Sequence, residues 1–106
     1  MKTIFKQIIG HTSGEFKLEL PKNSAILSVM SQHDAVVVHY LCDSEETQFF
    51  TFKFFMFETG KPLPENSDNL SYLKTVSLLG EDYILHVFVD LNALEEFTKV
   101  TEIKES

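Results

Sequence analysis

The sequence contains no arginine, and its 9 lysines are outnumbered by 16 aspartates and glutamates, which gives a formal net charge of −7. Nucleic-acid binding normally needs a basic stripe that neutralises phosphates, and arginine supplies the forked contacts to phosphate and guanine. The composition therefore argues against direct binding of DNA or RNA. An acidic surface keeps a protein in solution, and it also suits a partner with a basic surface.

Cysteine is nearly absent as well. Cys42 is the single cysteine of the 106-residue chain, so an internal disulfide is excluded. With 43% hydrophobic residues, a chain of this length can bury one core without disulfides or metal. No apolar stretch approaches the length of a membrane span, and the first residues are too polar for a signal peptide. We therefore expect a cytosolic protein without a membrane partner.

The motifs of common enzymes are missing too. The sequence has no Gly-x-Ser-x-Gly elbow, no P-loop and no dinucleotide-binding fingerprint. Cys42 ends an apolar stretch, which is more typical of a small core residue than of a nucleophile. His39 and His86 lie in predicted strands and could meet across a sheet, which leaves a metal open, although no histidine pair has zinc-site spacing. We predict a protein that is not an enzyme, with no catalytic residue, metal or cofactor.

Phenylalanine, by contrast, is abundant, and six of the ten phenylalanines lie between Phe49 and Phe57. In a strand, alternate side chains point to opposite faces, so Phe55 and Phe57 lie opposite the more apolar face. That first face is predicted to hold Phe50, Phe52, Phe54 and Met56. A strand this apolar on both sides is either central in its sheet or covered by a partner chain. We expect Phe55 and Phe57 to contribute to the interface of a homo-oligomer.

Turn signals divide the chain into short strands with few long connections. Parallel crossovers need a dozen or more residues, which most of these connections lack, so neighbouring strands are expected to be antiparallel. The sequence predicts a mainly β, β-rich α+β fold, with an antiparallel sheet folded into a sandwich or half-barrel. The predicted strands are 2–8, 15–20, 25–32, 35–42, 47–58, 70–79 and 83–90.

The end of the chain has a different pattern. Leu91, Leu94 and Phe97 recur at helical spacing after Asp90, a residue suited to an N-cap. We predict a β-rich domain over residues 1–90 and a C-terminal helical tail over 91–106, with these three apolar residues added to the oligomer interface.

The long connection after the phenylalanine-rich strand is the best candidate for a ligand site. Gly60 permits close backbone approach, and Thr59 and Lys61 could contact an anion there. A rigid, proline-braced connection with a solvated lysine is the simpler alternative. A helical turn could begin near Pro64. A second candidate is an aromatic surface on which a base or a partner side chain could stack, formed by Phe55, Phe57, Tyr72 and Tyr83.

Several segments together resemble a family of small proteins of unknown function carried by bacteriophages and prophages. These segments are MKTIFK (1–6), LPKNSAILSV (20–29), FETGKPLP (57–64), YLKTV (72–76) and LHVF (85–88). The similarity spans about residues 1–90. In that family, the connection after the corresponding strand resembles the motif Gly-Thr-Gly-[His/Lys]-Pro. In this chain, Glu58 stands in place of the first glycine of the motif. The family's histidine near the end matches His86.

The resemblance implies a non-enzymatic phage accessory protein that interferes with host defence in the cytoplasm of the host cell, as a homo-oligomer. In one version it sequesters a small nucleotide-like signal near Thr59, Gly60, Lys61 and His86. In the other, its acidic surface blocks a host defence protein. The alternative is a structural or assembly module that binds only other phage proteins.

Overall fold

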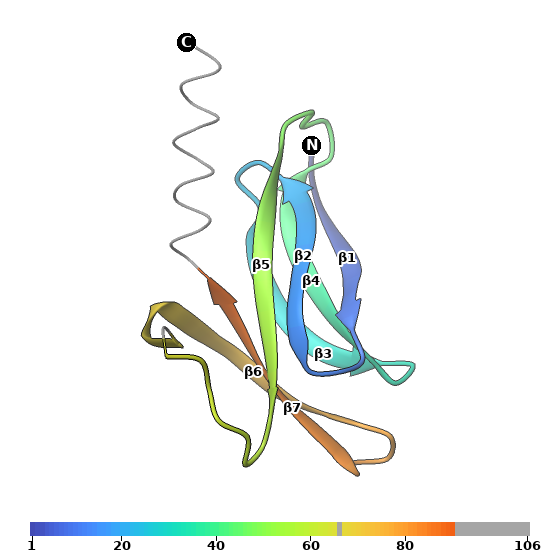
Figure 1. Ribbon diagram of the computed structural model, residues 1–106. Helices are drawn as coiled ribbons and strands as arrows, with labels where there is room; N and C mark the ends of the chain where they lie inside the picture. Colours follow the sequence, from blue (N-terminus) through green and yellow to red (C-terminus); the bar gives the residue numbers. More distant parts are fainter. Residues whose placement is uncertain (66, 91–106) are drawn as a thin grey trace.

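The computed structural model describes residues 1–65 and 67–90, and over these residues the chain forms two antiparallel sheets stacked face to face (Figure 1). The three-stranded sheet has the order β1-β4-β3, formed by β1 (Lys2–Gly10), β4 (Ala35–Asp43) and β3 (Ala25–Gln32). The four-stranded sheet has the order β2-β5-β7-β6, formed by β2 (Gly14–Pro21), β5 (Phe49–Glu58), β7 (Tyr83–Asp90) and β6 (Leu70–Leu78). The predicted mainly β, antiparallel sandwich is confirmed, and the predicted strands differ from the observed ones only at their ends.

The phenylalanine-rich strand β5 is central in its sheet, between β2 and β7. Its inner face is fully covered, since Phe54 and Met56 are 0% exposed. On its outer face, Phe55 and Phe57 are half-buried. The central position explains why the strand is apolar on both sides, because both of its edges are hydrogen-bonded and only its outer face reaches the surface.

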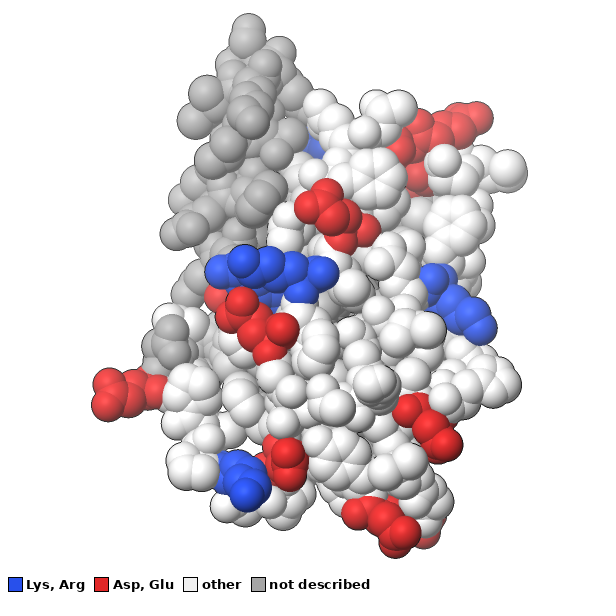
Figure 2. All heavy atoms as spheres, turned by 45° about the vertical axis from the view of Figure 1, so that its right-hand side comes forward, with Lys and Arg blue, Asp and Glu red and all other residues white. Residues whose placement is uncertain are grey.

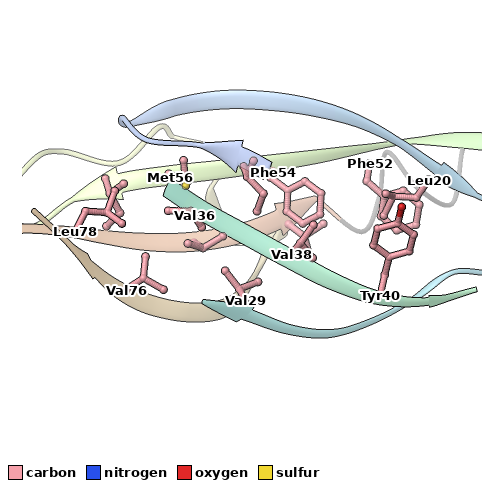
Figure 3. Packing of buried hydrophobic residues seen from close by; sticks show 14 of the residues in the cluster. Leu20, Val29, Val36, Val38, Tyr40, Phe52, Phe54, Met56, Val76 and Leu78 are labelled. Carbon is pink, nitrogen blue, oxygen red and sulfur yellow. The ribbon is translucent and has the colours of Figure 1, made fainter. Parts of the chain in front are cut away.

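The core lies between the sheets and is filled by the alternate, inward-facing residues of both (Figure 3). Phe52, Phe54 and Met56 of β5 meet valines of β4 there, because a pleated strand presents every second side chain to the same layer. The labelled residues of the cluster are Leu20, Val29, Val36, Val38, Tyr40, Phe52, Phe54, Met56, Val76 and Leu78. Cys42 lies on the same inner face of β4 and is 4% exposed, as predicted for a small core residue.

Two close contacts hold the sheets in position at their ends. The two-residue turn His33–Asp34 has positive φ at both residues, and Oδ1 of Asp34 accepts a hydrogen bond from the backbone N–H of Leu79 at 3.3 Å. At Gly10 a Cβ atom would lie 2.8 Å from the ring of Phe16 on β2. The absence of a side chain at Gly10 therefore lets β1 approach β2 where the two sheets meet.

The described part of the connection after β5 contains a 3-10 turn, η1 (Ser67–Asn69). The backbone N–H of Ser67 donates to the carbonyl of Pro64 at 3.1 Å, so the turn begins three residues after the predicted start near Pro64. The predicted C-terminal helix, with Leu91, Leu94 and Phe97, lies outside the described residues. Over residues 1–65 and 67–90, no helix has the length and hydrophobicity that crossing a bilayer demands.

Candidate binding face

Four aromatic rings gather on the outer face of the four-stranded sheet, and we call them the aromatic face: Phe55, Phe57, Tyr72 and Phe88. Strand register brings them together, since Phe88 of β7 pairs with Phe55 on one side and with Tyr72 on the other. The ring centroids of Phe57 and Phe88 are 5.5 Å apart in an edge-to-face arrangement, and those of Tyr72 and Phe88 are also 5.5 Å apart. Phe55 stacks on Phe57 at 6.2 Å. These are favourable aromatic geometries, so the rings hold one another in place.

A chain of hydrogen bonds runs along the edge of the aromatic face. His86 pairs with Phe57 of β5 and with Thr75 of β6. Its Nε2 lies 2.7 Å from Oγ1 of Thr59, and its Nδ1 lies 2.9 Å from Oγ1 of Thr75. Oγ1 of Thr75 is in turn 2.8 Å from the hydroxyl of Tyr72. Each hydroxyl can both donate and accept, so either neutral tautomer of His86 completes the chain.

The structure therefore unites part of the predicted ligand site. Thr59 and His86, which are far apart in the sequence, contact each other directly. Gly60 and Lys61 lie in the exposed turn that follows, where Gly60 has a φ of 84° and the N–H of Lys61 approaches the carbonyl of Glu58 at 3.4 Å. No heavy atom lies within 4 Å of a Cβ built on Gly60, so the turn is open to solvent.

Beside Thr59 is an acidic pocket of about 310 Å³, lined by Glu58, Thr59, Asp82, Tyr83 and Ile84. The Glu58 carboxylate is fixed in position: its Oε2 accepts hydrogen bonds from Oγ of Ser13 at 3.1 Å and from the hydroxyl of Tyr83 at 3.3 Å. With Glu58 and Asp82 in its wall and no lysine among its lining residues, the acidic pocket favours a cationic group over a phosphate.

A second pocket, of about 300 Å³, lies at the other end of the aromatic face, where Phe55 forms part of its wall. Its other lining residues come from four strands and the connection after β5: Glu15, Lys53, Pro64, Asn69, Leu70 and Asp90. Pro64 and Asn69 show that the connection after β5 returns over the sheet here. The aromatic face is thus bordered by carboxylates at both ends, with Lys53 at one of them.

The charges elsewhere on the surface are dispersed. On the side drawn in Figure 2, acidic groups are spread over the surface. Lys17 of β2 and Lys53 of β5 are cross-strand partners on the outer side of the four-stranded sheet. The expectation that the chain does not bind nucleic acid directly rests on its composition and stays a prediction.

The two strand histidines do not meet, contrary to the alternative left open above. His39 of β4 lies on the outer side of the three-stranded sheet, and His86 lies on the outer side of the four-stranded sheet, so the core separates them. Over the part of the chain that the structure describes, no three His, Cys, Asp or Glu side chains are grouped to hold a metal ion.

One prediction about the aromatic surface was wrong, and two residues were missed. Tyr83 does not belong to it, because Tyr83 begins β7 on the inner side, where it packs against the core and bonds Glu58. Phe88 takes the central place instead. The alternation of Ile84, His86 and Phe88 indicates that these residues share one side of their strand. The pairing of β7 between β5 and β6 was needed to show that this side joins the aromatic face. Apart from strand alternation, nothing in the sequence indicated that Thr75 would contact His86.

A family model for a domain of unknown function, DUF7352, matches residues 1–97. The chain belongs to this family. No curated protein and no solved structure matches the chain. The match extends seven residues beyond the predicted end of the β-rich domain at residue 90. The DUF7352 family carries no assigned function, which agrees with the predicted resemblance to proteins of unknown function, and the phage origin stays a prediction.

Proposed function

We propose that this DUF7352 chain is a non-enzymatic binding protein that blocks a basic site on another protein. The aromatic face and the acidic pocket beside it form the contact surface. The predicted resemblance to bacteriophage accessory proteins supports a host defence protein as the partner, met in the cytoplasm of the host cell.

The observation that carries this proposal is the aromatic face itself. Phe55, Phe57 and Phe88 are half-buried and Tyr72 is 58% exposed, so four rings present area to the surface at once. Aromatic residues of this kind dominate binding energy at protein interfaces, because they bury a large area at low entropic cost.

The acidic pocket sets the chemistry of the partner. Because Glu58 is already held by Ser13 and Tyr83, it loses little side-chain freedom when it meets a lysine or arginine. The net charge of −7 adds long-range attraction toward a basic surface. A partner with a basic rim around an apolar centre fits both features.

The second candidate is capture of a nucleotide-like signal, and one observation favours it. Phe57, Phe88 and Tyr72 form a platform on which a base could stack, next to the hydrogen-bonding groups of Thr59 and His86. The carboxylates of the acidic pocket oppose a phosphate group at that end, so we rank this second.

The half-exposed rings also support the expected homo-oligomer, in which Phe55 and Phe57 would lie between copies. Light scattering of the wild-type chain beside a Phe57→Ser variant separates the two uses of the face. A larger mass that falls to the monomer in the variant assigns the rings to self-assembly. A monomer in both assigns them to another partner.

The central test is co-purification of the tagged chain from bacterial cells, followed by native mass spectrometry. We expect the wild-type chain to retain a protein, and Phe88→Ala and Asp82→Lys to lose it. Phe49→Ala is the matched control for the ring, since Phe49 is on the outer face of β5 at its far end and is 49% exposed. Glu81→Lys is the control for charge, since Glu81 is adjacent and does not line the pocket.

Retention of the same protein by all four variants would contradict the proposed surface. A retained small molecule, lost in Phe88→Ala, would move the function to capture of a signal. A retained protein that belongs only to phage particles would favour the assembly module. Loss of a measurable activity in His86→Ala or Cys42→Ala, with the fold intact, would contradict the non-enzymatic assignment.

A further inference from the structure

The outer side of the three-stranded sheet is a second, separate surface, and aliphatic side chains dominate it. Strand register places Ile8 of β1, Val37 of β4 and Met30 of β3 in one row. Ile4 and Leu41 pair in another row, nearer the other end of the sheet. We call these five residues the aliphatic face.

This face exposes apolar area. Ile4 is 58% exposed and Ile8 is 64% exposed, whereas Val37 between Ile8 and Met30 is only 3% exposed. The floor of the face is therefore packed and its flanks stand out into solvent. Contiguous exposed apolar surface of this kind marks interaction sites in soluble proteins.

A trough of about 430 Å³ lies beside Val37. Ile8, Ala35 and Val37 give it apolar walls, and its polar lining residues are Lys6, Gln7, Gln32 and His33. None of the residues that line it is acidic. The neighbouring Asp34 accepts the N–H of Leu79, so its carboxylate is engaged with the turn between β6 and β7.

Within these rows the sign of the charge is opposite to the net charge of the molecule. Between the two aliphatic rows lies a row of Lys6, His39 and Ser28, and none of the three rows contains a carboxylate. In a chain of net charge −7, this is a surface that attracts acidic groups. A second copy placed face to face on this surface would set one cationic row against another, so charge disfavours self-association through this face.

His39 adds a further observation. Its ring atom Nδ1 is buried and has no hydrogen-bond partner among the described residues. A buried polar atom without a partner costs free energy, and turning the ring toward a carboxylate over the middle row would satisfy it.

We propose that the aliphatic face docks a protein segment that alternates aliphatic and acidic side chains. Side chains on one face of a strand repeat about every 7 Å, so Ile4, Lys6 and Ile8 present an aliphatic, a cationic and an aliphatic group in turn. A segment with the matching order places its carboxylate over Lys6 and its apolar groups on the two flanking rows. This surface is independent of the aromatic face, and together they make the chain a two-sided adaptor.

The test uses the full-length, ¹⁵N-labelled chain and two end-blocked hexapeptides, one of alternating leucine and glutamate and one of alternating leucine and lysine. We expect the acidic peptide to shift amide signals of β1, β3 and β4, and the basic peptide to bind at least about tenfold more weakly. Lys6→Glu should weaken the acidic peptide about tenfold, and Lys74→Glu on β6, the matched control, should not. Ile8→Ser is the second variant, because so exposed a side chain can change without loss of the fold, and it should weaken the same peptide.

Equal binding of both peptides would overturn the proposal, and so would amide shifts confined to the four-stranded sheet. Failure of the acidic peptide to bind would overturn it as well. Signals of β1, β3 and β4 that move on dilution of the chain alone would assign the face to a second copy instead.

Discussion

Each outer face of the sandwich carries one strand histidine between apolar residues, and the two histidines differ in their hydrogen bonds. His86, on the aromatic face, uses both ring nitrogens, bonded to Thr59 and Thr75. His39, next to the aliphatic face, has a buried Nδ1 without a partner. On the aromatic face, both ring nitrogens of the histidine thus have hydrogen-bond partners within the fold. On the other face, one buried ring nitrogen has none among the described residues. Among the described residues, the aromatic face is preorganised, whereas the middle row of the other sheet still has a hydrogen bond to make.

Charge separates the faces in the same way. Glu58 and Asp82 line the pocket beside the aromatic face. Lys6, by contrast, lies on β1 in the middle one of three rows on the other sheet, and none of these rows contains a carboxylate. A single acidic chain can therefore present surfaces of opposite preference. The net charge of the whole molecule therefore does not predict the charge of either face, because the two sheets expose different residues to the solvent.

The largest expected effect separates the inner from the outer side of β5. Phe54→Ala should lower the free energy of unfolding by roughly 3–5 kcal/mol, because it empties a fully buried site. Phe55→Ala should cost about 1 kcal/mol, because that ring is only partly buried. Urea denaturation of both variants measures the difference. Equal losses of unfolding free energy in the two variants would mean that a second layer covers Phe55 as completely as the core covers Phe54.

The next effect concerns the contact between the two sheets. Gly10→Ala should cost about 1–3 kcal/mol, because the new methyl group would meet the Phe16 ring. In a double-mutant cycle, Phe16→Leu should recover part of that loss. Gly60→Ala is the control: its cost arises from a positive φ, so Phe16→Leu should leave it unchanged. Strictly additive losses at Gly10 and Phe16 would show that the ring does not set the approach of β1 to β2.

Replacing each strand histidine tests the comparison itself. His86→Leu should lower the free energy of unfolding by about 1 kcal/mol, because Thr59 and Thr75 lose their shared partner. His39→Leu should be neutral or stabilising, because it removes a buried polar atom that had no partner. Thermal or urea unfolding at neutral pH gives both values. A loss at His39 that equals the loss at His86 would mean that His39 already has an unseen partner.

The smallest effect lies at the end of the three-stranded sheet. The pKa of Asp43 is lowered from its ordinary value, first by the hydrogen bond from the N-terminal ammonium group at 2.6 Å and then by that from the N–H of Glu45 at 3.0 Å. A pKa that folding depresses stabilises the protein at pH values above the unfolded pKa, and this contribution is lost as the pH falls through the folded pKa. Because the side chain is exposed, the contribution is small.

An NMR titration of the Asp43 carboxyl group measures that shift. Acetylation of the N-terminus should raise the pKa of Asp43 toward its ordinary value. A titration curve that acetylation leaves in place would show that the ammonium group does not hold the carboxylate.

Strand periodicity was enough to predict much of the fold. Alternation along residues 49–57 placed Phe54 and Met56 in the core and Phe55 and Phe57 opposite, because which side a side chain faces is a local property. Which strands are neighbours is not local. The contact of Thr59 with His86 and the central place of Phe88 both depend on β7 pairing between β5 and β6, and the misplacement of Tyr83 has the same cause. The helical tail over residues 91–106 remains a prediction, since it lies outside the described residues.

The central claim is that the aromatic face and its acidic pocket hold a basic protein partner. Native mass spectrometry of the chain purified from cells tests this most directly, with wild type and Asp82→Lys run side by side. The account predicts a second protein bound to the wild type and absent from Asp82→Lys, while Glu81→Lys keeps it. A wild-type chain that carries only a small molecule, or a partner that Asp82→Lys retains in full, would contradict the account.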